Sequence, residues 1–262
     1  MPSPFRLGRA AFEAYARRLD LDELALDPGD VNAHVETKGA SLASWAWAGP
    51  TIGYARLTVI ETAAGFRVAN WAAFPRFDCV APMCQAELIE VKGRLFLLVL
   101  DALALPGEDR ARTALRTLGA GLEAVKPVVT RPTWAQDFIT EDAIWSRSNS
   151  EAALDEAVGV FSAYMAASTT WLLEGAVDGR AGERRALYAR MRKRFLAHEP
   201  SRPFMVKTFG AAWSERYTAG FLFPERVTEA TLVGSRTRLC AGEKRAAAMA
   251  PSAATKRVAA TA

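Results

Sequence analysis

The fold of this chain is decided by one stretch, Cys84-Gln85-Ala86-Glu87-Leu88-Ile89-Glu90-Val91-Lys92-Gly93-Arg94-Leu95-Phe96-Leu97-Leu98-Val99-Leu100-Asp101. Residues 84–91 read as a strand, and Lys92-Gly93 predicts a tight turn into a second strand. Residues 95–100 are apolar on both parities, so this second strand should lie inside a sheet with both faces covered. Because strands joined by short turns run antiparallel, the stretch predicts the centre of an antiparallel sheet.

More strand signals precede this stretch, beginning at about Ser41. Residues 56–62 and 66–74 flank Ala63-Ala64-Gly65, which predicts a hairpin turn. Residues 9–19 carry apolar side chains at helical spacing: Phe12, Tyr15, Ala16 and Leu19. The N-terminal half therefore predicts one helix followed by an antiparallel meander.

Helical patterns follow the sheet. They cover residues 112–125, a helix opened by a capping box at Ser148 and Glu151, a helix that ends before Pro200, and a last helix over residues 203–220. Together with the strands they predict an α/β fold, a single domain over residues 1–234 with helices on both faces of the sheet. Residues 235–262 are rich in Ala, Lys and Arg and poor in large apolar side chains, which predicts a disordered tail.

Composition limits the class of protein. The chain has 262 residues, of which 50% are hydrophobic and 24% charged, and a net charge of +4. No apolar run is long enough to span a bilayer and no secretory signal is apparent, so we expect a cytoplasmic protein that does not bind membranes. Its three cysteines lack metal-ligand spacing and are expected to be free thiols in a reducing compartment.

Basic side chains cluster in residues 183–185 and 190–194. They form either a solvated helix face or a surface for an acidic protein partner or an anionic small molecule. No nucleic-acid-binding motif accompanies them, so we expect no nucleic-acid partner.

Several kinds of chemistry lack a motif. The only histidines are His34 and His198, and no zinc-protease, paired-cysteine or phosphate-binding glycine motif occurs. Gly119-Ala120-Gly121 lacks the third glycine of a dinucleotide loop. Acid–base chemistry by carboxylates remains open.

Two glutamates are candidates for that chemistry. Glu87 shares strand parity with Ile89 and Val91, so it should face an apolar layer, and Glu199 directly precedes Pro200. A carboxyl group in an apolar setting has a raised pKa and can act as a general acid. The alternative is a partly buried glutamate paired with an arginine.

Several segments resemble the ferredoxin-dependent bilin reductases. One group lies in the sheet: Asn70-Trp71-Ala72-Ala73-Phe74-Pro75, residues 81–88 and Val99-Leu100-Asp101. A more specific match covers residues 202–217 and Phe221-Leu222-Phe223, which resemble the family's closing helix. Thr133-Trp134 and Trp145-Ser146-Arg147 stand where the family has a tryptophan and a substrate-contacting arginine.

The resemblance implies a three-layer α/β/α sandwich that binds biliverdin between the sheet and its C-terminal helices. It implies no bound metal or organic cofactor, reduced ferredoxin as the external electron donor, and carboxylic acids as proton donors. Glu87 and Glu199 align with the family's two catalytic carboxylates, which are usually Asp. One added methylene moves the acidic proton by about 1.5 Å, which leaves the product open.

The same resemblance implies roles for six further residues. Asn70 aligns with a catalytic position that is His in phycocyanobilin-forming enzymes and Asn in phycoerythrobilin-forming ones, and Thr58 stands where the former carry a catalytic Glu. Arg147 and Arg202 are candidates to bind the biliverdin propionates. The alternative for Arg147 is a surface salt bridge to Glu141 or Asp142, and the alternative for Arg202 is a cap on its loop. Trp71 and Trp134 either stack on pyrrole rings or fill the core.

We therefore expect a monomeric ferredoxin-dependent reductase of biliverdin IXα that forms a phytobilin through bilin radicals. Reduction of another linear tetrapyrrole, such as red chlorophyll catabolite, and bilin binding without catalysis are the alternatives. The number of electrons transferred and the double bond reduced stay open.

Overall fold

The computed structural model describes residues 9–126, 133–135 and 139–225, and the structural statements below concern these residues. Their strands form one antiparallel sheet in the order β1-β3-β4-β5-β6-β7-β8, with β2 paired to β3 at one edge. The strands are β1 (Asp22–Glu23), β2 (Ala33–Val35), β3 (Ala40–Ala48), β4 (Ile52–Thr62), β5 (Phe66–Pro75), β6 (Met83–Val91), β7 (Arg94–Leu103) and β8 (Ile144–Arg147).

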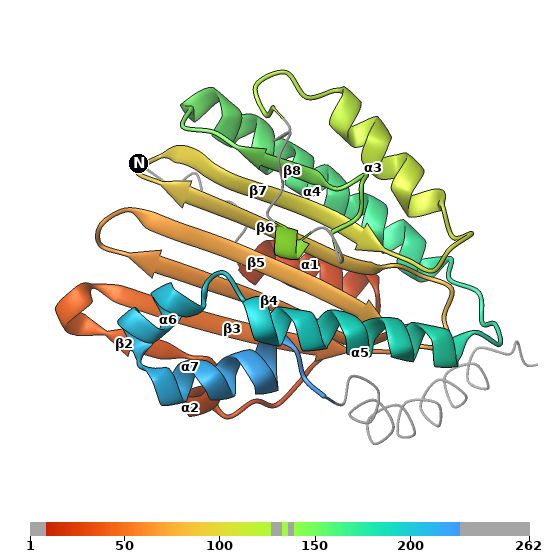
Figure 1. Cartoon of the computed structure of the whole chain (residues 1–262), viewed down its shortest axis with the longest axis horizontal. Coiled ribbons are helices and arrows are strands. Elements are labelled where there is room, and N and C mark those ends of the chain that lie inside the picture. Colours follow the sequence, from red (N-terminus) through yellow and green to blue (C-terminus); the bar gives the residue numbers. More distant parts are fainter. Residues whose placement is uncertain (1–8, 127–132, 136–138, 226–262) are drawn as a thin grey trace, which may run out of the picture.

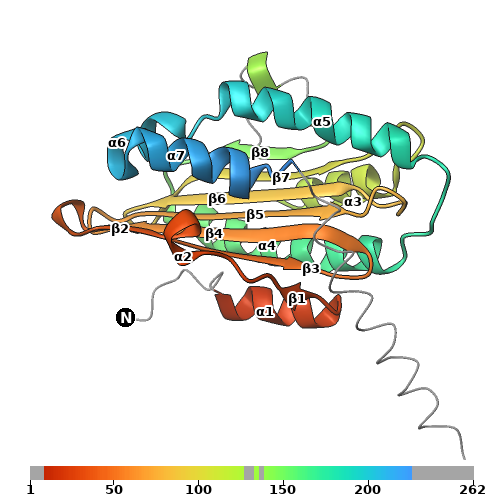
Figure 2. The same cartoon turned by 90° about the horizontal axis from the view of Figure 1, so that it is seen from below.

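Helices cover both faces of this sheet, as Figure 2 shows. One layer holds α1 (Arg9–Arg18), α3 (Arg110–Ala120) and α4 (Glu151–Leu173). The other holds α2 (Pro28–Val31), α5 (Ala181–His198), α6 (Arg202–Phe209), α7 (Ala211–Tyr217) and a π-helical turn, η3 (Thr218–Leu222). The predicted α/β fold with a central antiparallel sheet is confirmed.

The two strands and the tight turn predicted over residues 84–101 are present in the structure. Lys92 and Gly93 both have positive φ, 51° and 79°, as the two central residues of a tight hairpin turn require. The β7 strand that follows has buried side chains on both faces from Leu97 to Ala102. Gly65, with φ of 81°, lies in the turn between β4 and β5.

Strand parity places the two largest hydrophobic cores on opposite faces of the sheet. In β5, Ala69, Trp71 and Ala73 pack toward α1 and α4, whereas Val68, Ala72 and Phe74 pack toward α5–α7. Alternate side chains of one strand thus serve opposite layers. We call the surface of the sheet that carries Val68, Ala72 and Phe74 the α5-side face; Figure 1 shows it toward the viewer, with α5 lying across β4 and β5.

The structure corrects three details of the helices. The N-cap of α4 is Ser150, whose Oγ accepts a hydrogen bond from the amide of Ala153 at 3.4 Å, and not Ser148. The helix expected over residues 112–125 runs from Arg110 to Ala120. The last helix, expected over residues 203–220, is broken in two at Gly210, whose φ of 94° no helix allows.

Strand β8 was not expected from the sequence, and it pairs with β7 at the edge of the sheet. Among the described residues, we find no helix with the length and apolar character to cross a membrane. The tail expected over residues 235–262 lies outside the described residues.

Candidate active site

A row of side chains crosses the α5-side face through the middle of the sheet. The register pairs Ser44 with Thr58, Thr58 with Asn70, and Asn70 with Glu87. The row continues to Val99 on β7 and Trp145 on β8. Because directly paired residues point to the same face, the sheet alone brings three predicted site residues together: Thr58, Asn70 and Glu87.

Glu87 is held by its neighbour in this row. The amide nitrogen Nδ2 of Asn70 donates a hydrogen bond to Glu87 Oε1 at 3.2 Å, and Asn70 Oδ1 accepts one from Arg56 Nη1 at 2.6 Å. Arg56 is buried, whereas Asn70 and Glu87 keep partial exposure. Asn70 and Glu87 are therefore the members of this group that keep some accessible surface.

Glu199 approaches the same region from the helical layer that covers the α5-side face. Pro200 ends α5, so residue 199 leaves the helix as its C-cap. Its Oε1 accepts hydrogen bonds from the backbone nitrogen of Ser201 at 3.1 Å and from Ser201 Oγ at 2.7 Å. These bonds fix the carboxyl at the start of the α5–α6 connection.

The electrostatics of the two carboxyl groups suit proton donation. Burial and the negative charge of Glu199 raise the pKa of Glu87 to about 7, against the opposing effects of Asn70 and Arg56. Burial also raises the pKa of Glu199, although its hydrogen bonds to Ser201 and the charge of Arg56 act against this. A carboxyl group that titrates near neutral pH can hold a proton and release it on demand.

Thr58 is tied to the closing helices rather than left open. The hydroxyl of Tyr217 on α7 lies 2.6 Å from Thr58 Oγ1 and 2.8 Å from Ser44 Oγ. Burial raises the pKa of Tyr217 to about 12, so its hydroxyl stays protonated at neutral pH. Thr58 therefore anchors α7 to the sheet beside the carboxyl groups.

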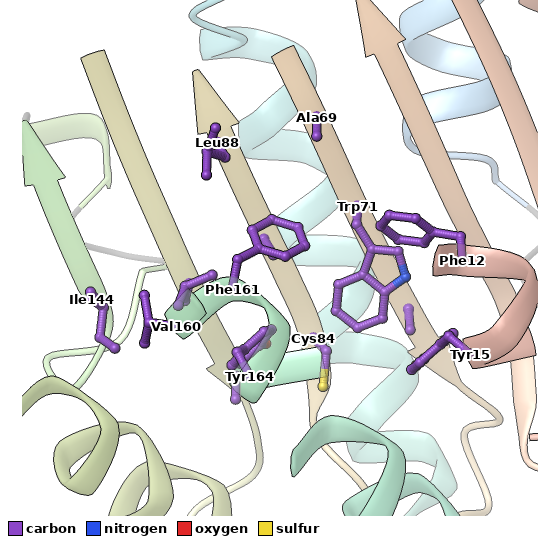
Figure 3. Close-up of a cluster of buried hydrophobic side chains, with 14 of the residues drawn as sticks. Phe12, Tyr15, Ala69, Trp71, Cys84, Leu88, Ile144, Val160, Phe161 and Tyr164 are labelled. Carbon is purple, nitrogen blue, oxygen red and sulfur yellow. The ribbon is translucent and has the colours of Figure 1, made fainter. Parts of the chain in front are cut away.

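The structure removes Trp71 from the site. Trp71 lies on the opposite face of the sheet from Asn70 and Glu87, with 1% of its surface exposed. Its ring centroid lies 5.3 Å from that of Tyr15 and 6.1 Å from that of Tyr164, both edge-on (Figure 3). The prediction that Trp71 stacks on a ligand between the sheet and α5–α7 is wrong, because its parity directs it into the other core.

The remaining predicted contacts lie at the margins. Arg147 shares a face with Glu87 through its pairing with Leu97, is exposed, and places its guanidinium 5.7 Å from the ring centroid of Phe96. Arg202 makes an exposed ion pair with Glu215 at 2.9 Å. Trp134 lies in the short 3-10 helix η2 (Thr133–Ala135), and its side chain is outside the described part of the structure.

Three residues of the site were missed by the sequence reasoning. Arg56 shares the parity of Thr58 and Ile60, so the argument that singled out Glu87 also predicts a buried arginine here. Gln85 neighbours Glu87 on the same face, and its Nε2 lies 3.5 Å from Met191 Sδ on α5. Tyr217 lay within the matched C-terminal segment, but only the fold places its hydroxyl beside Thr58.

Within the described ranges, no group of three or more His, Cys, Asp or Glu residues is arranged to hold a metal ion. Acidic, amide, guanidinium and hydroxyl groups make up the polar part of the site. They supply a proton donor, a hydrogen-bonding amide and a fixed positive charge.

The chain is similar in sequence to known ferredoxin oxidoreductases and in fold to a solved structure. Two relatives are each 25% identical to the chain: a phycoerythrobilin:ferredoxin oxidoreductase of Gloeobacter violaceus, matched over 84% of this chain and 95% of its own, and a 15,16-dihydrobiliverdin:ferredoxin oxidoreductase of Parasynechococcus marenigrum, matched over 75% and 88%. The crystal structure of phytochromobilin synthase from tomato in complex with biliverdin superposes with a TM-score of 0.75 at 18% identity, covering 88% of this chain and 87% of its own. The family model for ferredoxin-dependent bilin reductase matches residues 9–224. The chain therefore belongs to the ferredoxin-dependent bilin reductases, a family of oxidoreductases.

Proposed function

We propose that this protein reduces biliverdin IXα to a phytobilin with electrons from ferredoxin. The observation that carries the proposal is the pair Glu87 on β6 and Glu199 at the start of the α5–α6 connection, two carboxyl groups with raised pKa that are close enough for the charge of Glu199 to act on Glu87. A tetrapyrrole lying between the sheet and the C-terminal helices would contact both.

The chemistry balances with two electrons and two protons for each double bond reduced. Two reduced ferredoxins each give one electron, so the bilin passes through a radical after the first transfer. Glu87 and Glu199 each hold one proton for the reduced bilin and regain it from solvent. Two carboxyl groups that each bind and deliver one proton match the demand of one two-electron reduction.

Asn70 positions the tetrapyrrole beside these acids in our proposal. An amide donates and accepts hydrogen bonds but does not act as an acid at neutral pH. Thr58 supplies no carboxyl group where the phycocyanobilin-forming enzymes have one, which argues against their route of vinyl reduction. The exposed guanidinium of Arg147 is proposed to meet a propionate at the edge of the sheet.

Ferredoxin is proposed to dock over α5. The exposed side of this helix carries Arg185, Arg190, Lys193 and Arg194, and its only acidic residue, Glu183, pairs with Arg180. A positive surface attracts an acidic electron carrier and raises its association rate. Helix α5 covers one face of the sheet (Figure 2), and the register places Glu87 on that face.

One chain supplies every group in this scheme, which supports a monomer as the active unit. Cys79 and Cys84 are buried free thiols, which supports a reducing compartment such as the cytoplasm.

The test is an anaerobic assay with biliverdin IXα and reduced ferredoxin. We expect a blue-shifted product band, because reduction shortens the conjugated system, preceded by a transient radical signal in electron paramagnetic resonance. Chromatography of the product then identifies the double bond reduced. The Glu87→Gln variant should bind biliverdin and turn over slowly, whereas Glu61→Gln, which alters an exposed carboxyl at the end of β4, should match the wild type.

Tight biliverdin binding without turnover, repeated with several ferredoxins, would contradict the proposal and favour a bilin-binding protein. Turnover of red chlorophyll catabolite in place of biliverdin would instead assign another linear tetrapyrrole as the substrate.

A further inference from the structure

We infer that Arg56 is a positioning residue for the acid Glu87: its guanidinium orients the amide of Asn70 so that nitrogen, and not oxygen, faces the carboxyl group. Its consequence for turnover rests on the proposed function, whereas its consequence for the titration of Glu87 does not.

Arg56 is fixed on three sides. It is 3% exposed in the middle of β4, and its Nε donates to the carbonyl oxygen of Leu222 at 2.9 Å. Its Nη1 donates to Asn70 Oδ1 at 2.6 Å, and the guanidinium lies 5.7 Å from the ring centroid of Phe223. The closing segment after α7 therefore clamps the guanidinium against the sheet.

The guanidinium determines which way the amide points. A guanidinium has five N–H donors and no acceptor, so only the oxygen of Asn70 can face it favourably. The nitrogen then faces Glu87 and donates to Oε1 at 3.2 Å. Rotating the amide by half a turn would oppose donors to donors at Arg56 and oxygen to a carboxylate at Glu87.

This orientation favours the ionised form of Glu87, because an N–H donor stabilises a carboxylate. The permanent positive charge of Arg56 acts in the same direction, and it also lowers the pKa of Glu199. Burial and the charge of Glu199 oppose both effects at Glu87. Arg56 thus keeps a desolvated acid able to give up its proton near neutral pH.

Three tyrosines and an aspartate also lie near Arg56 and Glu87. Tyr54 on β4, Tyr188 on α5 and Tyr217 on α7 face Arg56, and burial keeps their hydroxyls protonated by raising their pKa. Asp101 on β7 is 1% exposed and accepts hydrogen bonds from Thr140.

The experiment follows the carboxyl carbon of Glu87 by NMR through a pH titration of the full chain without substrate. The signal is assigned by its loss in Glu87→Gln. We expect Arg56→Gln to raise the pKa of Glu87 by about one unit or more, and Arg56→Lys, which keeps the charge without the planar fork, to raise it less. Arg67→Gln is the matched control, since Arg67 on β5 pairs with Glu61 and Glu90 and should leave Glu87 unchanged.

Asn70→Ala removes the amide that Arg56 orients and so tests the same contact. It also provides a test if Arg56→Gln does not fold. It should also raise the pKa of Glu87. When Arg56→Gln is combined with Asn70→Ala, it should shift the pKa of Glu87 by less than it does in the wild type, because the amide that transmits part of the effect is gone. Equal shifts in both backgrounds, or an unmoved pKa in Arg56→Gln or Asn70→Ala, would overturn the inference.

Turnover supplies a separate readout. The alkaline limb of the pH–rate profile should move upward with the pKa of Glu87 in Arg56→Lys. If the wild type fails to reduce biliverdin, the proposed function falls, and the NMR titration still decides the role of Arg56.

Discussion

Glu199 raises the pKa of Glu87 through its negative charge, although the two residues lie on different layers of the fold. The sheet presents Glu87, and the end of α5 presents Glu199. Two carboxyl groups that share one region do not ionise independently, since the first charge opposes the second. The pair is therefore expected to retain a proton at a pH where an isolated glutamate has lost it.

Removal of the Glu199 charge should lower the pKa of Glu87. In Glu199→Gln the negative neighbour is gone, while burial still keeps the pKa above the ordinary 4.5 of glutamate. A carboxyl-carbon NMR titration of Glu87 measures the change. Glu215→Gln, which alters an exposed glutamate paired with Arg202, is the control and should leave Glu87 at about 7. An unchanged titration in Glu199→Gln would show that burial alone sets the pKa.

The stability of the protein should fall between about pH 4.5 and about pH 7 in a way that depends on Glu87. The folded-state pKa lies above the unfolded one, so the folded protein binds the proton more tightly, and this contribution is lost as pH rises through 7. At full ionisation the cost is about 3–4 kcal/mol. Urea unfolding should show that Glu87→Gln gains clearly more stability relative to the wild type at pH 8 than at pH 5. An equal difference at both values would mean that Glu87 does not titrate in this window.

Strand parity explains why the sheet and half of the site could be predicted from the sequence. Alternation of polar and apolar residues reports which face a strand residue occupies, so the sequence pattern alone places Glu87 on a buried face. The same parity puts Arg56 on that face. It also separates Trp71 from its chain neighbour Asn70, because adjacent strand residues point to opposite sides.

What parity does not report is which helices close over each face. The approach of Glu199 to Glu87 and the bond from Tyr217 to Thr58 depend on contacts between segments far apart in the chain. Strand β8 is four residues long, too short for a clear periodic signal, so the placement of Arg147 also required the fold.

Trp71→Leu should destabilise the fold without changing bilin affinity. The side chain fills the core between the sheet, α1 and α4, as Figure 3 shows, and truncating a large buried side chain costs about 2–4 kcal/mol. Chemical denaturation measures the loss, and a biliverdin titration at low temperature measures the affinity of the folded protein. If the fully folded Trp71→Leu variant bound biliverdin more weakly than the wild type, Trp71 would have to be part of the substrate site.

Reversal of charge on α5 should weaken the use of ferredoxin. Arg190→Glu and Lys193→Glu alter exposed side chains, so we expect a several-fold higher KM for ferredoxin at low salt with little change in biliverdin affinity. The difference should shrink at high salt, because ions screen exposed charges. Arg17→Glu on α1, in the opposite helical layer, is the control of equal charge change. If Arg17→Glu raised the KM for ferredoxin equally, the effect would come from the net charge of the protein and not from docking on α5.

Gly210→Ala should destabilise the protein and loosen the site together. Gly210 joins α6 to α7 with φ of 94° and ψ of 151°, a conformation that side chains other than that of glycine rarely adopt, so strain and not lack of space is the cause. Such strain costs about 1–3 kcal/mol. Because α7 carries Tyr217, relief of the strain by a shift of α7 would disturb the bonds to Thr58 and Ser44. Thermal unfolding measures the loss of stability, and a biliverdin titration measures the disturbance of the site.

Gly182→Ala, at a glycine of ordinary φ with open space around it in α5, is the control and should be neutral or stabilising. If Gly210→Ala behaved like Gly182→Ala, the break between α6 and α7 would not depend on glycine.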